Sequence, residues 1–119
     1  MTVLSRVASR LAKLPTATTP GVSVDRNVAI TMPDGVVLAA DRYYPTASSD
    51  GLPLLLTRTP YGRKIEGLLA RIFAERGYQV LVVSCRGTFD SGGDWLPFQN
   101  ERADGRAVLA WVAEQPWFG

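Results

Sequence analysis

The segment LPLLLTRTPYGRKIEGLLARIFAERGYQVLVV, residues 52–83, decides the fold. It begins with an apolar run over Leu52–Thr57 that does not alternate, as expected for a strand covered on both faces. Apolar residues then recur at helical spacing over 65–73, and Gly77 is suited to the left-handed cap that ends a helix. A second apolar run covers Val80–Val83. This order of strand, helix and strand predicts a βαβ unit with parallel strands, and therefore an α/β fold.

An antiparallel hairpin is expected before this unit. Between Val22 and Met32, apolar residues alternate with polar ones, which is the pattern of a half-buried strand. Asp34-Gly35 supplies the turn, because glycine tolerates positive φ and aspartate favours a local side-chain hydrogen bond. The second strand of the hairpin is expected over Val36–Tyr44, and Pro45 closes it.

A further helix follows the βαβ unit, after a glycine-rich loop over residues 86–100. Asn100 is its candidate N-cap, and Glu101 and Asp104 in the first turn match the helix dipole. Pro116 stops the helix. Its buried face is expected to consist of Val108, Trp111 and Val112.

Two regions are expected in the chain. Residues 1–21 form an N-terminal amphipathic arm and linker, and residues 22–119 form one partial α/β domain. Within residues 1–14, leucine and valine recur at helical spacing with basic residues on another face, and such a helix can lie on a membrane surface. The simpler interpretation of so short a stretch is an arm that packs on its own domain.

Composition excludes several classes of function. The 119 residues carry 13 Lys and Arg against 11 Asp and Glu, a balance that does not indicate nucleic-acid binding. The chain has no histidine, which removes the usual general base of nucleophilic catalysis and the commonest zinc ligand. Its single cysteine, Cys85, fits a reducing compartment. Neither a signal peptide nor a transmembrane segment is visible, so we expect a cytoplasmic protein.

No catalytic or cofactor motif can be read directly from the residues. The glycine-rich segment over 86–93 has neither the ending of a P-loop nor the spacing of a dinucleotide fingerprint. Ser91 is not in a Gly-x-Ser-x-Gly elbow, and neither Ser84 nor Cys85 has a histidine to activate it. A buried structural thiol is the better interpretation of Cys85. The acidic residues show no metal-ligand spacing, so neither a metal nor a cofactor is predicted.

Five blocks occur in order across residues 22–118. They are MPDGVVLAAD at 32–41, RTPYGR at 58–63, RGY at 76–78, RG through DSGG at 86–93, and DG through QPW at 104–117. Together these blocks resemble one family, the serine hydrolases typified by cocaine esterase and the X-prolyl dipeptidyl-peptidases (CocE/NonD type). The chain departs from the common pattern of that family at Ser84, where aspartate is frequent, and at Phe89, where glycine is frequent. The resemblance implies the N-terminal part of an α/β-hydrolase fold.

The resemblance also implies a function. Members of the family cleave ester or amide bonds with a Ser-His-Asp triad through an acyl-enzyme. Tyr61 matches the family tyrosine whose hydroxyl is one donor of the oxyanion hole, whereas the residues alone leave open that Tyr61 merely packs in a Pro-x-Gly turn. The family nucleophile, acid and base lie beyond the stretch that the 119 residues match. We therefore expect the chain by itself to be inactive, and to act on a small-molecule ester or amide only when completed.

The same resemblance places the family's nucleophile strand beside the Leu52–Thr57 strand. Without that neighbour, an apolar edge with unpaired backbone groups is expected, and the chain would be marginally stable, self-associate, or pair with a complementary segment. The rival hypothesis is a non-catalytic remnant or interaction module that binds a partner strand at this edge.

Overall fold

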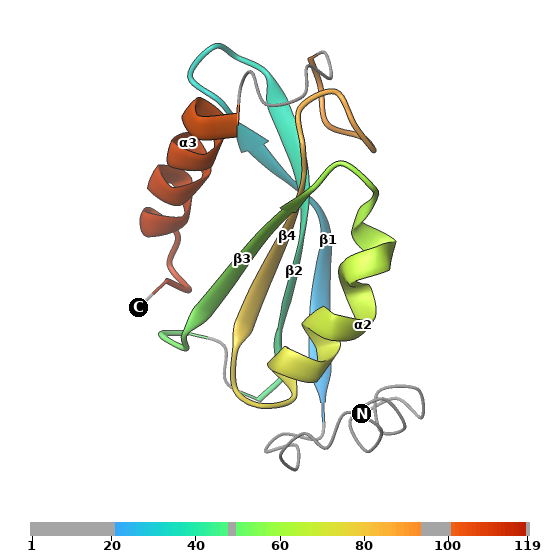
Figure 1. Cartoon of the computed structure of the whole chain (residues 1–119). Helices are drawn as coiled ribbons and strands as arrows, with labels where there is room; N and C mark the ends of the chain where they lie inside the picture. The colour runs from blue at the N-terminus through green and yellow to red at the C-terminus, as the bar shows by residue number, and fades with distance from the viewer. Residues whose placement is uncertain (1–20, 48–49, 94–100, 119) are drawn as a thin grey trace.

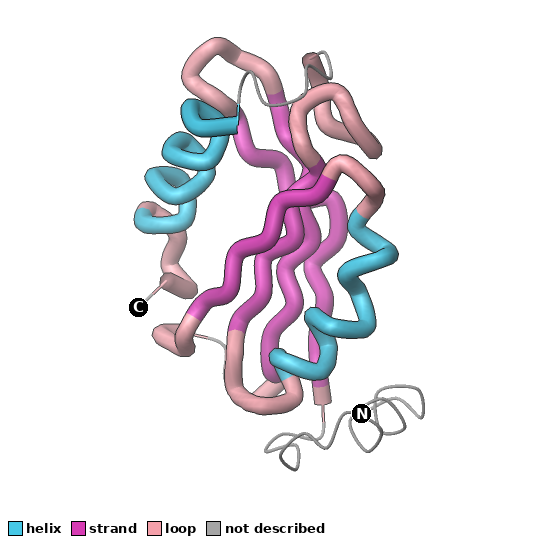
Figure 2. The backbone as a smooth tube through the Cα atoms, in the orientation of Figure 1, coloured by secondary structure: helices cyan, strands magenta, loops and turns pink. Residues whose placement is uncertain are grey.

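The computed structural model of the chain describes residues 21–47, 50–93 and 101–118 (Figure 1). The predicted arm at 1–14 and the Asn100 cap lie outside these ranges. The sheet has the strand order β1-β2-β4-β3, with α2 against one face and α3 against the other (Figures 1 and 2). The elements in chain order are β1 (Val22–Thr31), β2 (Val37–Pro45), β3 (Leu54–Thr59), α2 (Arg63–Ala74), β4 (Gln79–Ser84) and α3 (Glu101–Ala113).

The predicted hairpin is present. β1 and β2 pair antiparallel, from Val22 opposite Pro45 to Thr31 opposite Val37. Gly35 adopts φ +88° in the turn between them, which is the left-handed conformation that glycine supplies at least cost. The register shifts between Asp25 and Val28, so β1 carries a bulge near its middle.

The βαβ unit is confirmed, with one correction to its first strand. β3 and β4 pair in parallel, but β3 covers Leu54–Thr59 rather than Leu52–Thr57. Pro53 has no N–H to donate, and its carbonyl accepts the Gln79 N–H at 2.8 Å just before the ladder begins. All six residues of β4 are buried. β3 also packs against a core on each face, with Leu54 and Leu56 on the α3 side and Leu55 on the α2 side, as expected. β3 is the outer strand of the sheet and is half-buried for most of its length.

Alternate residues of β4 belong to two separate cores. Val80 and Val82 pack under α2, and Leu81 and Val83 pack under α3. The predicted buried face of α3 is confirmed, because Val108 and Val112 are buried and Trp111 packs against the same core. The core on the α2 side contains Tyr43, Ala70, Ala74, Val80 and Val82; the core on the α3 side contains Ile30, Met32, Leu38, Ala40, Leu81, Val83, Val108 and Val112.

The apolar stripe predicted for α2 is only partly buried. Ile65 is 69% exposed and Leu69 is 51% exposed, so these two residues of the stripe are left largely outside the core. The α2 residues buried in the core are the small Ala70 and Ala74, which pack with Tyr43 of β2, and Phe73 packs against the same core. A sheet face can cover only one side of a helix, so the apolar stripe of α2 is wider than the surface that buries it.

The end of α2 is as predicted. Gly77 has φ +90°, and its N–H donates to the Ala74 carbonyl at 3.1 Å. The Tyr78 N–H donates to the Phe73 carbonyl at 3.3 Å, and the two rings meet edge to face with centroids 5.7 Å apart. This pair of bonds with its apolar contact is a Schellman motif.

The Schellman motif allows a test of the fold. Gly77→Val should lower the free energy of unfolding by about 1–2 kcal/mol, because a β-branched residue is strained at positive φ. Gly77→Asn should cost less, because asparagine tolerates the left-handed region better. Urea unfolding followed by circular dichroism measures both. Equal losses for the two variants would show that the conformation at residue 77 does not limit stability.

Candidate functional site

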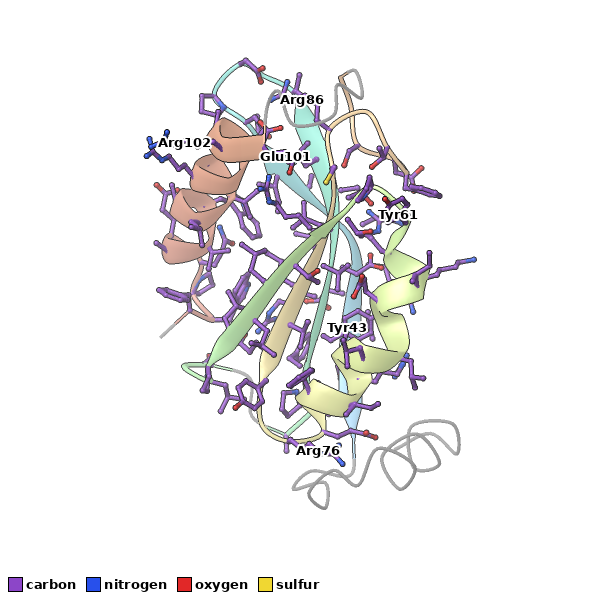
Figure 3. The ribbon with its side chains drawn as sticks, viewed as in Figure 1. Tyr43, Tyr61, Arg76, Arg86, Glu101 and Arg102 are labelled. Atoms are coloured by element: carbon purple, nitrogen blue, oxygen red, sulfur yellow. The ribbon has the colours of Figure 1, made fainter. Side chains whose placement is uncertain are left out.

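Tyr61 lies directly after the carboxyl end of β3, at the junction with α2 (Figure 3). Its side chain is 73% exposed, and no described residue hydrogen-bonds its hydroxyl. Its backbone N–H donates to Oγ1 of the buried Thr59 at 3.0 Å, which fixes the start of the loop. The sequence therefore placed Tyr61 correctly at a strand-to-helix junction, and its role as an oxyanion donor stays a prediction.

A cavity of about 410 Å³ lies beside Tyr61. It is bounded by the loop that enters α2, the first residues of α2, the bulge of β1, and the loop after β4. Its size is in the range of small-molecule sites in proteins. The lining residues are Arg26, Asn27, Asp41, Tyr61, Gly62, Arg63, Lys64, Phe89 and Asp90.

Asp41 and Arg63, which both line the cavity, form a buried ion pair. Asp41 of β2 lies 3.5 Å from Arg63 Nε and accepts the Asn27 N–H at 3.1 Å. Arg63 Nη2 donates to Asn27 Oδ1 at 2.7 Å, so both residues hold the bulge of β1, where Asn27 has φ +55°. Sequence analysis named neither Asp41 nor Arg63 as a site residue. Asp41 falls in a strand and Arg63 is one of many arginines, so only their contact in space distinguishes them.

The loop after β4 closes over Gly62. Phe89 and Asp90 adopt φ +38° and +74°, in the region that L-residues rarely occupy. A side chain at position 62 would meet the Phe89 ring at 3.2 Å, so glycine is required for this approach, and Gly62 itself has φ +100°. The Phe89 ring thus packs against Gly62, the residue after Tyr61, from a strained backbone conformation.

The two serines of this region have structural environments. Ser91 Oγ donates to the Ser84 carbonyl at 2.7 Å and accepts the Ala39 N–H at 2.9 Å. Both bonds tie the loop to β2 and β4. Ser84 is fully buried, and its Oγ has no hydrogen-bond partner among the described residues. These positions agree with the interpretation that neither hydroxyl is an activated nucleophile.

Arg86, labelled in Figure 3, joins the same loop to the β1–β2 turn and to the first turn of α3. Its guanidinium donates two bonds to the Asp104 carboxylate, at 2.7 and 2.9 Å, and one to Asp34 Oδ2 at 2.7 Å. The hydrogen bonds that Arg86 donates to Asp104 and Asp34 raise the pKa of Arg86, and the bond that Asp34 accepts lowers the pKa of that carboxyl. The hairpin turn, the loop after β4 and the first turn of α3 are therefore held together.

Cys85 is buried with a free thiol, as predicted. Burial raises the pKa of this thiol above its ordinary value of 9.0, and the nearby Glu101 carboxylate adds to the effect. The thiol is therefore kept neutral.

Among the described residues, no group of three or more His, Cys, Asp or Glu side chains could hold a metal ion.

Residues 34–119 match the family described as X-Pro dipeptidyl-peptidase (S15 family). The chain belongs to this family. Cocaine esterase of Rhodococcus sp. (strain MB1 Bresler) is 37% identical to this S15 chain over 101 residues, which are 80% of the chain and 17% of that enzyme. The S15 chain thus spans less than a fifth of the length of this curated relative.

Solved structures agree on the fold. A CocE/NonD family hydrolase from Staphylococcus aureus superposes with a TM-score of 0.70 at 18% identity, over 88% of this S15 chain and 26% of that protein. An α/β-hydrolase from Penicillium sp. sh18 superposes with a TM-score of 0.68 at 21% identity, over 84% of this S15 chain and 35% of that protein. The fold is the N-terminal part of an α/β-hydrolase: a hairpin, a βαβ unit and a further helix, as predicted.

The buried thiol gives a test of the site region. The reaction of Cys85 with iodoacetamide should be slower in the folded chain than in urea, because burial disfavours the reactive thiolate. The pKa of Cys85 is higher in the folded chain than in the unfolded chain, so burial of the neutral thiol contributes to stability at neutral pH. This contribution to the free energy of unfolding is lost as the pH rises above 9.0 and through the pKa of the folded chain. Equal rates in both states would contradict the buried position of Cys85.

Proposed function

We propose that this chain is the segment of a serine hydrolase that supplies the tyrosine donor of the oxyanion hole. The enzyme cleaves ester or amide bonds, of acyl or X-prolyl-peptidyl type, through an acyl-enzyme. One observation carries the proposal, which is the position of Tyr61 directly after the carboxyl end of a parallel strand. Its side chain is exposed and no described residue hydrogen-bonds its hydroxyl, while its backbone N–H is held by Thr59. Ligands bind at such strand ends in α/β sheets.

The chemistry follows from the position of the hydroxyl. Attack on an ester or amide carbonyl places negative charge on its oxygen, and a donor already in place stabilises that charge without reorganising. The backbone N–H after the nucleophile would be the second donor. The contact of Phe89 with Gly62 and the Thr59 bond both restrain the loop that carries Tyr61, which favours a preset donor.

The substrate is proposed to be a small-molecule ester or amide. Family membership supports both bond types, since the S15 family is described by a peptidase activity and the Rhodococcus relative is an esterase.

A cytoplasmic location stays a prediction, supported by the free thiol of Cys85. Within the described ranges, none of the helices has the length and apolar character needed to cross a membrane.

The first test concerns the 119 residues themselves. They contain no histidine and no Gly-x-Ser-x-Gly sequence, so the purified chain should hydrolyse p-nitrophenyl acetate no faster than buffer alone. Turnover well above that background, retained after a second purification step, would mean that the chain carries catalytic machinery outside the proposal.

The second test uses a polypeptide in which this chain continues through the segments that follow it in the relatives. Tyr61→Phe should lower kcat by about 100- to 1000-fold, which is the usual effect of removing one oxyanion donor. Tyr78→Phe is the matched control, because it removes a hydroxyl beyond the C-terminal end of α2, whereas Tyr61 precedes its N-terminal end, and it keeps the ring packed on Phe73. A Tyr61→Phe enzyme with unchanged kcat would remove Tyr61 from the reaction.

A second candidate function is binding of another chain at the sheet edge. β3 pairs with β4 on one side, and no described strand pairs with its other side. β1 is the opposite edge, but it carries a bulge and the exposed Asp25, Arg26 and Asn27, features that disfavour strand addition. β3 reads Leu-Leu-Leu-Thr-Arg-Thr and is the edge that self-association or complementation would use.

A charge at the β3 edge tests this candidate. Thr57→Lys should reduce any concentration-dependent association in sedimentation velocity, because lysine opposes edge-to-edge pairing. Ala29→Lys, at an exposed position of the β1 edge, should leave association unchanged. A wild-type chain that stays monomeric at high concentration with a cooperative thermal transition would count against binding through β3.

A further inference from the structure

The bulge of β1 is joined to the start of α2 by a closed network of polar contacts. Arg63 Nη2 donates to Asn27 Oδ1 at 2.7 Å, and the Asn27 N–H donates to Asp41 Oδ1 at 3.1 Å. The same Asp41 oxygen lies 3.5 Å from Arg63 Nε. Three elements that are separate in the sequence, β1, β2 and α2, therefore meet at one guanidinium group, whose side chain is only 10% exposed.

Asn27 meets two requirements of this network at once. Its φ of +55° lies in the left-handed region, where glycine would be the least strained residue. Glycine, however, has no side chain that could accept a hydrogen bond from Arg63. Asparagine tolerates the left-handed conformation better than most residues and supplies an amide oxygen. The residue type at position 27 therefore fits a bulge whose side chain is used as well as its backbone.

The network lies two residues from Tyr61 in the chain. Gly62 is between them, with φ +100°, and glycine leaves the backbone more freedom than any other residue. On the N-terminal side, the Tyr61 N–H donates to Thr59 Oγ1. On the C-terminal side, Arg63 is the first residue of α2 and is fixed by the network. Tyr61 is thus held between two fixed points, and the bulge of β1 sets the second one.

We propose that Asn27 and Arg63 are positioning residues for the Tyr61 hydroxyl. This proposal rests on the proposed function of Tyr61 as an oxyanion donor, and adds that the bulge of β1 determines where the donor stands. A donor stabilises the developing oxyanion only if it is already at hydrogen-bond distance, so an error of about 1 Å in its position slows the reaction strongly. The effect requires no contact between these two residues and the substrate.

The test is a double-mutant cycle in the polypeptide that continues through the segments following this chain in its relatives. Asn27→Gly removes the acceptor for Arg63 and keeps the left-handed backbone without strain. It should lower kcat about tenfold and change KM less than about twofold, because the donor acts mainly on the transition state. In the Tyr61→Phe background, the same substitution should lower kcat less than about twofold, because the hydroxyl that it positions is already gone.

Two further variants separate positioning from general damage. Asn27→Asp keeps a side-chain oxygen for Arg63 and tolerates the left-handed region, so it should retain most of the kcat that Asn27→Gly loses. Arg102→Gln removes an exposed charge from α3, on the other face of the sheet (Figure 3), and should leave kcat unchanged. Arg63 and Asp41 are left intact in these variants, because breaking a buried ion pair is strongly destabilising.

The 119-residue chain gives a second measurement that does not involve catalysis. Exchange of the Tyr61 amide hydrogen with solvent, followed by NMR, should be faster in Asn27→Gly than in the unchanged chain. Exchange of the Gly77 amide hydrogen, which bonds to Ala74 at the other end of α2, should be the same in both. Equal acceleration at Tyr61 and Gly77 would show a general loss of stability and would count against positioning.

The outcomes of the cycle distinguish this proposal from the oxyanion role. If Tyr61→Phe leaves kcat unchanged, Tyr61 is not a donor and the positioning role falls with it. If Tyr61→Phe lowers kcat but Asn27→Gly lowers it equally with and without the hydroxyl, only the positioning role is overturned. Unchanged kcat in Asn27→Gly, or equal losses in Asn27→Gly and Asn27→Asp, would overturn it too.

Discussion

Burial of β4 on both faces is the constraint on which the rest of the structure depends. A strand with consecutive apolar residues, such as Val80–Val83, is apolar on both faces, so it needs a neighbour on each edge and a helix over each face. β2 and β3 supply the edges, α2 covers Val80 and Val82, and α3 covers Leu81 and Val83. Because β3 runs parallel to β4, its carboxyl end points to the same end of the sheet as Cys85 and Arg86. Tyr61 and the loop after β4 meet there for this reason.

The order and type of the elements could be predicted from sequence because local signals and burial agree. Gly77 is a clear case: the helical stripe ends there, and the left-handed φ, the two bonds and the ring contact all follow. β3 was harder. An apolar run has the same appearance in a central strand and in an outer strand, so sequence alone could not show that β3 would be half-buried.

Much less of the site could be predicted. Tyr61 stands out only through the family resemblance of its segment. Asp41 and Arg63 are 22 positions apart in the chain and become a pair through the crossing of α2 over β2 and the bulge of β1. The left-handed conformations at Asn27, Phe89 and Asp90 are at residues other than glycine, where sequence gives little warning. Such contacts depend on tertiary structure, and they are what give the cavity its charge.

The most direct test of the oxyanion role of Tyr61 is structural. A polypeptide that includes the segments following this chain in its relatives would be crystallised with a boronic acid, which forms a tetrahedral adduct with a nucleophilic serine. If Tyr61 completes the oxyanion hole, its hydroxyl should lie about 2.7–3.1 Å from one oxygen of the adduct, with a backbone N–H as the second donor. A Tyr61 hydroxyl that points to solvent, with other donors around that oxygen, would contradict the role.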